Sequence, residues 1–314
     1  MTKDESKEIS ELMEKHSVSI GMPVYNGELF LKKTLDSLLS QTFRNFELII
    51  SDNASTDGTE KICKEYEKKD HRISYFRQPY SMGALPNFRF VLDKARNEFF
   101  MWNAADDLRD KKFIEKMMGI LDADKKNVGC MSKAEFYNLG NQHTHKESNN
   151  NSINKFLFKM RYLLKPGDLY SLEGTYEKKV RLFLNKSKTW LFYGLFRTEE
   201  LRKSWVDDEL IGIGVIVIVN ILKFGNIKIL DETLTYFYDG GSSKKGIIHL
   251  SKLFNLNFFE KIFLYYPLTK NCRKSLGAKI FLKNIDYFIQ LNLWGFISLL
   301  IDLIQKKNGK DTRN

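Results

Sequence analysis

The chain has 314 residues, of which 43% are hydrophobic and 28% charged, a composition typical of folded proteins and not of disordered ones. Its net charge is +11, and its three cysteines, none in a CxxC motif, exclude a disulfide framework. The sequence contains no run of 18 apolar residues, so it predicts no membrane-spanning helix. Residues 1–16 lack the apolar core of a signal peptide, so we expect a cytoplasmic protein.

The first 125 residues alternate between two kinds of apolar pattern. Residues 3–16 are polar, with Ile9, Leu12 and Met13 at helical spacing, and predict a short leading helix. Buried strands are then predicted from four short apolar runs, at 18–22, 46–51, 72–76 and 98–102. Helical patterns separate them, at 31–39, 58–69 and 84–96. This alternation has the spacing of βαβ units, and it predicts an α/β fold with a mixed, mostly parallel sheet flanked by helices.

The rest of the chain changes in character several times. Residues 138–176 are rich in Asn, Lys, Ser and Gly, and we expect a loop there. Residues 212–225 are almost wholly apolar and long enough for a buried helix. From Lys244 the sequence is basic, aromatic and helical in period. We therefore divide the chain into a lead-in helix (1–17), two halves of one α/β domain (18–125 and 126–243) and a C-terminal helical extension (244–314).

A set of polar residues follows each predicted strand. These sets lie at Pro23–Gly27, at Ser51–Thr59, at Gly83 with Asn87, and at Asn103–Asp107. Ligands of such sheets bind at the carboxyl ends of the strands, so we expect the four sets to line one crevice.

Three aspartates in these sets have a side chain suited to a defined role. Asp52 is suited to accept from a base N–H or a ribose hydroxyl, whereas Asp57 is better placed to cap the next helix. Asp106 and Asp107 offer hard oxygen ligands for Mg²⁺ or Mn²⁺ on a diphosphate, or else they begin the helix that follows.

The segment VSIGMPVYNGELFLKKTLDSLLSQTFRNFELIISDNASTDGT at residues 18–59 resembles the opening of the family 2 glycosyltransferases, which have the GT-A fold. The similarity is strong over residues 18–125 and weaker over 190–201 and 221–243. It implies an enzyme that transfers a sugar, with inversion, from a nucleoside diphosphate sugar, most often a UDP-sugar. The acceptor implied is a hydroxyl of a glycan or glycolipid in surface polysaccharide synthesis. Because no GxGxxG motif follows the first strand, a Rossmann oxidoreductase is disfavoured.

The resemblance also implies roles for individual residues. Those implied to bind the nucleoside of the donor are Pro23, Tyr25, Asn26 and Asp52. Asn87 is implied to lie near the ribose and diphosphate, Asp106 to bind Mn²⁺ or Mg²⁺, and Asp107 to lie beside it in the nucleotide-sugar site. Such a cation stabilises the charge that builds on the leaving diphosphate.

The chain departs from the family pattern at three positions. Ala104 replaces an acidic residue two before Asp106, as in a branch of the family with a Trp- and Ala-rich strand end. Gly214 stands where the resemblance places the catalytic carboxylate, so Asp208 and Glu209 are our candidate bases. Asp239 stands where the family often has a histidine, and it is either a metal ligand or part of a turn. These departures leave open a catalytically silent relative that binds nucleotide sugar or glycan as an assembly partner.

The positive charge is concentrated at the C-terminal end. Residues 1–124 have a net charge of −3 and residues 125–314 one of +14, of which +9 lies in 244–314. The basic residues there are interspersed with large aliphatic and aromatic side chains, so we expect no nucleic-acid partner. Two interpretations remain: helices that pack on the catalytic domain or on a second subunit of a homodimer, or helices that lie on an anionic membrane surface, making the protein peripheral to the inner face of the membrane.

Overall fold

Strands and helices alternate through the first 125 residues, as the sequence predicts. The computed structural model describes residues 3–138, 168–186, 189–239, 248 and 257–307, and most of the predicted loop at 138–176 lies outside them. The first strands are β1 (Val18–Val24), β2 (Phe46–Asp52), β3 (Ile73–Arg77), β4 (Phe99–Trp102) and β5 (Leu108–Arg109). The helices among them are α1 (Lys3–Lys15), α2 (Glu28–Leu39), α3 (Thr59–Lys69), α4 (Ala84–Lys94) and α5 (Phe113–Ala123).

The second half of the domain completes the same sheet. Its strands are β6 (Asn127–Tyr137), β7 (Leu195–Arg197) and β8 (Asn226–Tyr238), and its helices are α7 (Tyr176–Lys186), the short 3₁₀ helix η1 (Thr189–Tyr193), α8 (Thr198–Ser204) and α9 (Ile213–Ile221). The strand order is β3-β2-β1-β4-β7-β6-β8-β5. Strands β1 to β4 are parallel, and so are β6 and β8, whereas β7 and β5 pair antiparallel to their neighbours.

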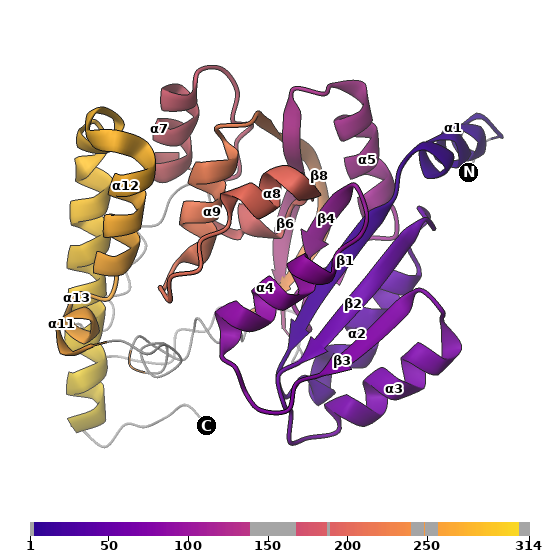
Figure 1. The fold of residues 1–314 in the computed structure, drawn as a ribbon, viewed down its shortest axis with the longest axis horizontal. Helices are drawn as coiled ribbons and strands as arrows, with labels where there is room; N and C mark the ends of the chain where they lie inside the picture. The colour runs from indigo at the N-terminus through magenta and orange to yellow at the C-terminus, as the bar shows by residue number, and fades with distance from the viewer. Residues whose placement is uncertain (1–2, 139–167, 187–188, 240–247, 249–256, 308–314) are drawn as a thin grey trace.

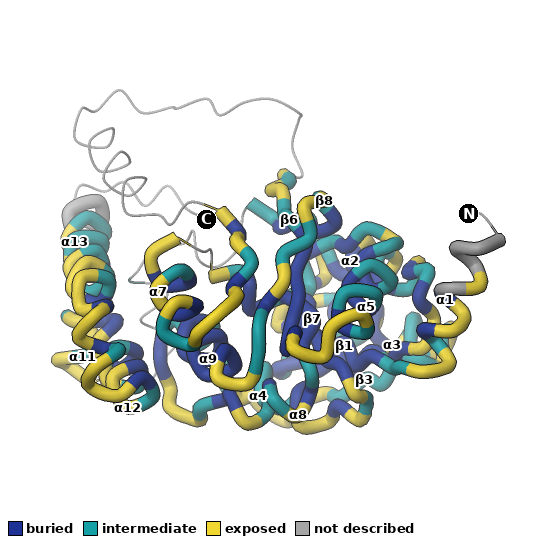
Figure 2. Tube along the Cα trace, turned by 90° about the horizontal axis from the view of Figure 1, so that it is seen from above, coloured by how far each residue is buried: buried dark blue, intermediate teal, exposed yellow. Residues whose placement is uncertain are grey.

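Helices cover both faces of this sheet. Helices α2 and α5 lie on one face, and α4 and α8 lie on the other (Figures 1 and 2). Helix α4 approaches β1 at Gly21, where a Cβ atom would lie 2.7 Å from Val91 and 2.5 Å from the ring of Phe100. The predicted fold class, an α/β domain with a mixed, mostly parallel sheet, is therefore confirmed. The division at residue 125 falls between α5 and β6, inside one continuous sheet, and stays a prediction.

An aromatic cluster packs at the end of β4. Trp102, the last residue of that strand, is fully buried, and its ring stacks on Phe192 of η1 at a centroid distance of 4.2 Å. Trp205, directly after α8, lies 5.7 Å from the same ring. The indole N–H of Trp102 donates to the carbonyl of Phe88 on α4 at 3.1 Å. The cluster thus joins β4, α4, η1 and the segment after α8 beneath the strand end.

The C-terminal extension is helical, as predicted. It contains α11 (Phe258–Ile262), α12 (Tyr266–Leu282) and α13 (Ile285–Lys307), which lie outside α7 and α9 at one flank of the molecule (Figure 2). Arg181 on α7 pairs with Asp286 at 2.7 Å, and Glu177 pairs with Lys283 at 2.5 Å. Among the described helices, none has both the length and the apolar content that crossing a membrane requires.

The aromatic cluster should contribute strongly to stability. Phe192→Ala removes a buried ring that stacks on Trp102, so it is expected to lower the free energy of unfolding by about 3–5 kcal/mol. Urea denaturation measures this change. The matched variant Phe224→Ala removes a ring that is nearly half exposed after α9, and it should cost about 1 kcal/mol or less. Equal losses in the two variants would contradict the packing described here.

Candidate functional site

The carboxyl ends of β1 and β2 are joined by a dense set of hydrogen bonds. Asn26, in the left-handed region at φ 50°, accepts on Oδ1 from the backbone N–H of Thr56 at 2.8 Å. The N–H of Asn26 donates to Ser55 Oγ at 2.9 Å, and the N–H of Gly27 donates to Thr59 Oγ1 at 2.8 Å. Asp57 accepts from the N–H of Thr59, the first residue of α3, but the N-cap itself is Gly58 and not Asp57 as predicted. These bonds fix the two strand-end loops side by side.

The predicted nucleoside-binding residues differ in how accessible they are. Tyr25 is more than half exposed, Asn26 is exposed and Pro23 is half-buried. Asp52 is fully buried: its carboxylate accepts from the N–H of Ser55 at 2.8 Å, from the Tyr75 hydroxyl at 2.7 Å and from Arg77 Nη1 at 2.9 Å. In this structure Asp52 therefore holds the loop and the Arg77 guanidinium at the strand ends.

Asn87 is also held within the fold. Its Oδ1 accepts from Ser51 Oγ at 2.6 Å, and its Nδ2 donates to the carbonyl of Ser51 at 2.9 Å. Both atoms are buried, so Asn87 attaches the first turn of α4 to the end of β2. Asn87 lies at the strand-end edge of the sheet, and its polar atoms already have protein partners.

The end of β4 presents two adjacent carboxyl groups. Asp106 is half-buried, and burial raises its pKa. Asp107 is buried more deeply, and burial followed by the negative charge of Asp106 raises its pKa to about 7. Helix α2 lies close to this strand end, because Thr34 Oγ1 donates to the carbonyl of Ala105 at 2.9 Å. The raised pKa values mean that the ionised forms of both carboxyls are destabilised. A bound cation would stabilise these ionised forms.

Arg109 is the buried cation closest to this pair in sequence. Its Nε donates to Asn103 Oδ1 at 2.8 Å, its Nη1 to Thr235 Oγ1 at 2.7 Å and its Nη2 to the carbonyl of Tyr193 at 3.0 Å. Burial lowers its pKa to about 10, so the guanidinium stays charged at neutral pH, and it opposes the rise in the pKa of Asp107. Sequence reasoning missed Arg109, although a basic residue two positions after the acidic pair was the available signal.

The end of β8 lies beside the same carboxyls. The N–H of Tyr238 donates to Asp107 Oδ1 at 3.3 Å, and the hydroxyl of Tyr137 donates to the carbonyl of Asp106 at 2.6 Å. The Tyr238 ring packs on Phe30 of α2 at a centroid distance of 4.3 Å. Asp239 follows Tyr238 directly, and its N–H donates to the carbonyl of Tyr137 at 2.9 Å. The structure thus brings the backbone of Asp239 to the edge that holds Asp106 and Asp107.

The two candidate bases lie on the segment between α8 and α9. Asp208 and Glu209 are both exposed, in a segment that begins at Trp205, against the end of β4. Their neighbour Asp207 lies 4.0 Å from Arg89 of α4. Gly214 lies within α9, where a Cβ atom would be 3.1 Å from Phe192 Cβ. A larger side chain at Gly214 would therefore lie in tight contact with Phe192.

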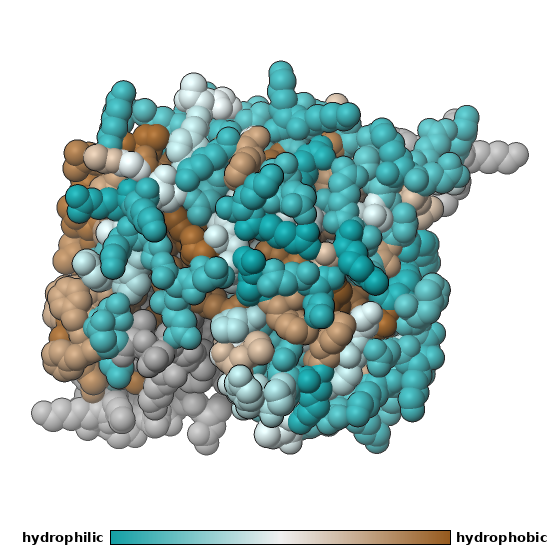
Figure 3. Space-filling model, viewed as in Figure 1, coloured by the Kyte–Doolittle hydropathy of each residue, from teal (hydrophilic) through white to brown (hydrophobic). Residues whose placement is uncertain are grey.

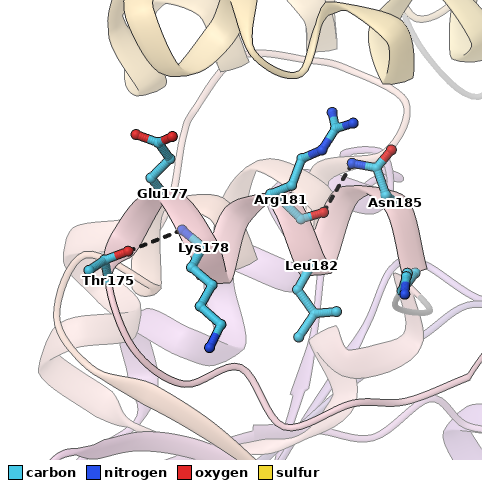
Figure 4. A pocket seen from close by; sticks show the side chains of 7 residues that line it. Thr175, Glu177, Lys178, Arg181, Leu182 and Asn185 are labelled. Carbon is cyan, nitrogen blue, oxygen red and sulfur yellow. Dashed lines mark hydrogen bonds between the residues drawn. The ribbon is translucent and has the colours of Figure 1, made fainter.

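A separate pocket of about 540 Å³ runs along α7. Figure 4 shows its lining, which comes from residues 175–186: Thr175, Glu177, Lys178, Arg181, Leu182, Asn185 and Lys186. None of the residues predicted to bind donor or metal lines this pocket. The candidate site is therefore the strand-end edge and not the α7 pocket.

Several proteins of similar sequence are named as glycosyltransferases. The chain is 33% identical over 129 residues to the putative glycosyltransferase EpsH of Bacillus subtilis, covering 41% of this chain and 37% of that protein. It is 35% identical over 91 residues to the GalNAc(5)-diNAcBac-PP-undecaprenol beta-1,3-glucosyltransferase of Campylobacter jejuni, covering 29% of each. The matches span between 14% and 42% of the length of the curated relatives.

Solved structures share the architecture over most of the chain. S. aureus TarS 1–349 in complex with UDP-GlcNAc superposes with a TM-score of 0.54 at 18% identity, covering 92% of this chain and 81% of that one. The mannosyltransferase PcManGT of Pyrobaculum calidifontis, in complex with GDP-Man and Mn²⁺, gives 0.53 at 13% identity, covering 96% and 81%. At these identities the likeness shows the fold, which is GT-A, as the sequence resemblance implies.

A protein-family model matches the part of the sequence that contains the strand-end region. The model of the family described as glycosyl transferase family 2 matches residues 19–177, just over half of the chain, and this range includes β1 to β6 and the Asp106–Asp107 pair. The chain therefore belongs to glycosyl transferase family 2.

Proposed function

We propose that this chain is an inverting glycosyltransferase that moves a sugar from a UDP-sugar to a hydroxyl of a glycan or glycolipid in surface polysaccharide synthesis. The observation that carries the proposal is the adjacent carboxyl pair Asp106–Asp107 at the edge where four parallel strands end. The exposed ring of Tyr25 lies on a loop of that same edge and is available to a nucleoside.

The donor class is supported by the ligands named for two structural neighbours. One neighbour is solved with UDP-GlcNAc and the other with GDP-Man. A nucleoside diphosphate fits the strand-end edge of this chain, because parallel α/β sheets bind ligands at the carboxyl ends of their strands. Arg77, held there by Asp52, supplies a cation at the same edge.

A divalent cation fits the residues present. Mg²⁺ and Mn²⁺ prefer carboxylate oxygens, and Mg²⁺ is commonly held by one or two carboxylates together with substrate phosphates. Asp106 and Asp107 supply two such groups, with Asp239 as a further candidate from the end of β8. Within the described residues no group of three or more His, Cys, Asp or Glu is placed to hold a metal, so donor phosphates would complete the ligand set. When bound, the cation would stabilise negative charge on the departing diphosphate.

Inversion requires a base on the acceptor side. As the acceptor oxygen forms its bond to the anomeric carbon and the bond to the diphosphate breaks, a carboxylate takes the proton of the acceptor hydroxyl. We assign this role to Asp208 or Glu209, because their segment begins against the end of β4 and both carboxyls are exposed to an incoming acceptor.

The acceptor class is supported by relatives whose names state theirs. The C. jejuni relative is named for an undecaprenol-linked glycan, and another, from B. subtilis, is a minor teichoic acid biosynthesis protein. We therefore favour a glycan or glycolipid of the cell surface as the acceptor.

Turnover with a panel of UDP-, GDP- and dTDP-sugars and Mn²⁺ tests the function directly. Transfer or donor hydrolysis is expected with a UDP-sugar and should be lost on chelation of the metal. Asp106→Asn should lower kcat/KM by about 10²–10³-fold and weaken metal-dependent UDP binding, because it removes an anionic ligand. Asp231→Asn, on an exposed residue paired with Lys133, is the matched control and should leave both unchanged. Nucleotide binding without transfer or hydrolysis for any acceptor would instead identify a catalytically silent relative.

The base assignment makes a separate prediction. Either Asp208→Asn or Glu209→Gln should lower kcat by about 10²–10⁴-fold while UDP binding stays as in the wild type, because the base acts only on the acceptor. Asp207→Asn, on the same segment, is the control and should keep its activity. Wild-type kcat in all three variants would exclude this segment as the source of the base.

The raised pKa of Asp107 predicts a pH effect on stability. Between its ordinary pKa of 3.8 and the folded value of about 7, the folded chain keeps a proton that the unfolded chain has released. The free energy of unfolding therefore falls as pH rises through this window. Asp107→Asn removes that loss, so the stability of the variant relative to wild type should increase by about 2 kcal/mol between pH 5 and pH 8. Urea unfolding without metal at both pH values measures it, and a difference independent of pH would contradict the prediction.

A further inference from the structure

The outward side of α13 carries an exposed apolar face. It consists of residues spaced three or four apart and at least one-third exposed, which together we call the apolar face: Ile285, Ile289, Leu293, Phe296, Leu300 and Leu303. At 1.5 Å per residue, the face runs for roughly 27 Å along the helix. Between Asp286 and Asp302 the helix contains no charged residue. A continuous exposed face of this kind marks an interaction surface.

An aromatic cluster extends this face sideways. The rings of Phe263 and Phe296 stack at a centroid distance of 6.2 Å, and Phe259 lies 4.9 Å from Phe263 and 5.2 Å from Tyr266. Phe258, on the same short helix α11, is 82% exposed. Hydrophobic side chains gather along the edge of the molecule formed by the C-terminal helices (Figure 3). The exposed surface is therefore wider than one helix.

Basic side chains accompany the apolar ones on the C-terminal helices. Five of them on α11 and α12 are exposed and make no ion pair within the described residues: Lys261, Lys270, Arg273, Lys274 and Lys279. Each of the three acidic side chains of residues 257–307 has a hydrogen-bond or ion-pair partner. Glu260 accepts from the N–H of its helix cap, Asp286 pairs with Arg181, and Asp302 accepts from the N–H of Ile248. This flank is therefore both apolar and positively charged.

We propose that this flank docks on an anionic lipid bilayer, with α13 lying along the surface and the basic side chains at the lipid phosphates. Apolar side chains inserted among the acyl chains and cations at the headgroups together give stable peripheral binding. A second copy of the chain fits less well, because a two-fold interface would bring the same basic residues of both copies together. The docking does not depend on the proposed transfer reaction, and its test uses no sugar donor.

Vesicle co-sedimentation of the full-length chain tests the docking. The protein should sediment with vesicles of mixed phosphatidylcholine and phosphatidylglycerol, much less with phosphatidylcholine alone, and less again at high salt. No sedimentation with the anionic vesicles, or equal binding to both compositions, would overturn the proposal. These outcomes are measured on the wild-type chain and so are independent of how any variant folds.

Two pairs of variants locate the surface. Lys270→Glu with Lys274→Glu should weaken binding to anionic vesicles about tenfold or more, since each basic residue near an anionic surface contributes to attraction. Lys125→Glu with Lys126→Glu makes the same charge change at exposed positions after α5 and should weaken binding much less. Equal losses in the two double variants would overturn the assignment to the C-terminal helices.

The apolar contribution is tested in the same assay. The triple variant Ile289→Ser, Leu293→Ser, Leu300→Ser should weaken binding at least about tenfold, whereas Phe224→Ser, at an exposed ring outside the surface, should not. Thermal unfolding by circular dichroism confirms that each variant folds. Unchanged binding by the triple variant would overturn the proposal. So would a dimer in sedimentation equilibrium that the triple variant dissociates, if the wild-type chain ignores the vesicles.

Discussion

The buried guanidinium of Arg109 is the interaction on which the geometry of the site depends. It lies on the two-residue strand β5, and its three hydrogen bonds reach the strand-end loop at Asn103, strand β8 at Thr235 and helix η1 at Tyr193. A buried charge of this kind is costly unless every donor finds a partner. Because those partners come from both halves of the domain, satisfying Arg109 fixes the halves relative to each other, and with them Asp106 and Asp107.

The strand-end site and the C-terminal helices carry charges of opposite sign. In the strand-end site, acidic groups are gathered and partly buried, and the proposed divalent cation would supply positive charge there. In the C-terminal helices, basic groups are exposed and the acidic ones are already engaged. We therefore propose an ionic ligand for the site and an extended anionic surface for the helices. The net charge of the chain is therefore informative only when it is divided between these regions.

The sequence was sufficient for the features that depend on local pattern. Alternating strands and helices, and polar residues after each strand, predicted the sheet and the edge at which Asp52, Asn87 and Asp106 lie. The sequence was insufficient for features that depend on packing between residues far apart in the chain. The pairing of β5 with β8 joins residues more than a hundred positions apart, and nothing near Arg109 indicates its partners. Likewise, the full burial of Asp52 depends on Arg77 and Tyr75 of the next strand, which sequence spacing does not place.

We propose that the Asp106–Asp107 edge receives the diphosphate of a nucleotide together with a divalent cation. A crystal structure with UDP and Mn²⁺, with data collected at the manganese absorption edge, tests it most directly. We expect an anomalous peak between the Asp106 carboxylate and the diphosphate, with the uracil beside the loop of Tyr25 and Asn26. A nucleotide bound elsewhere, for example in the pocket along α7, or a manganese peak away from both aspartates, would contradict it.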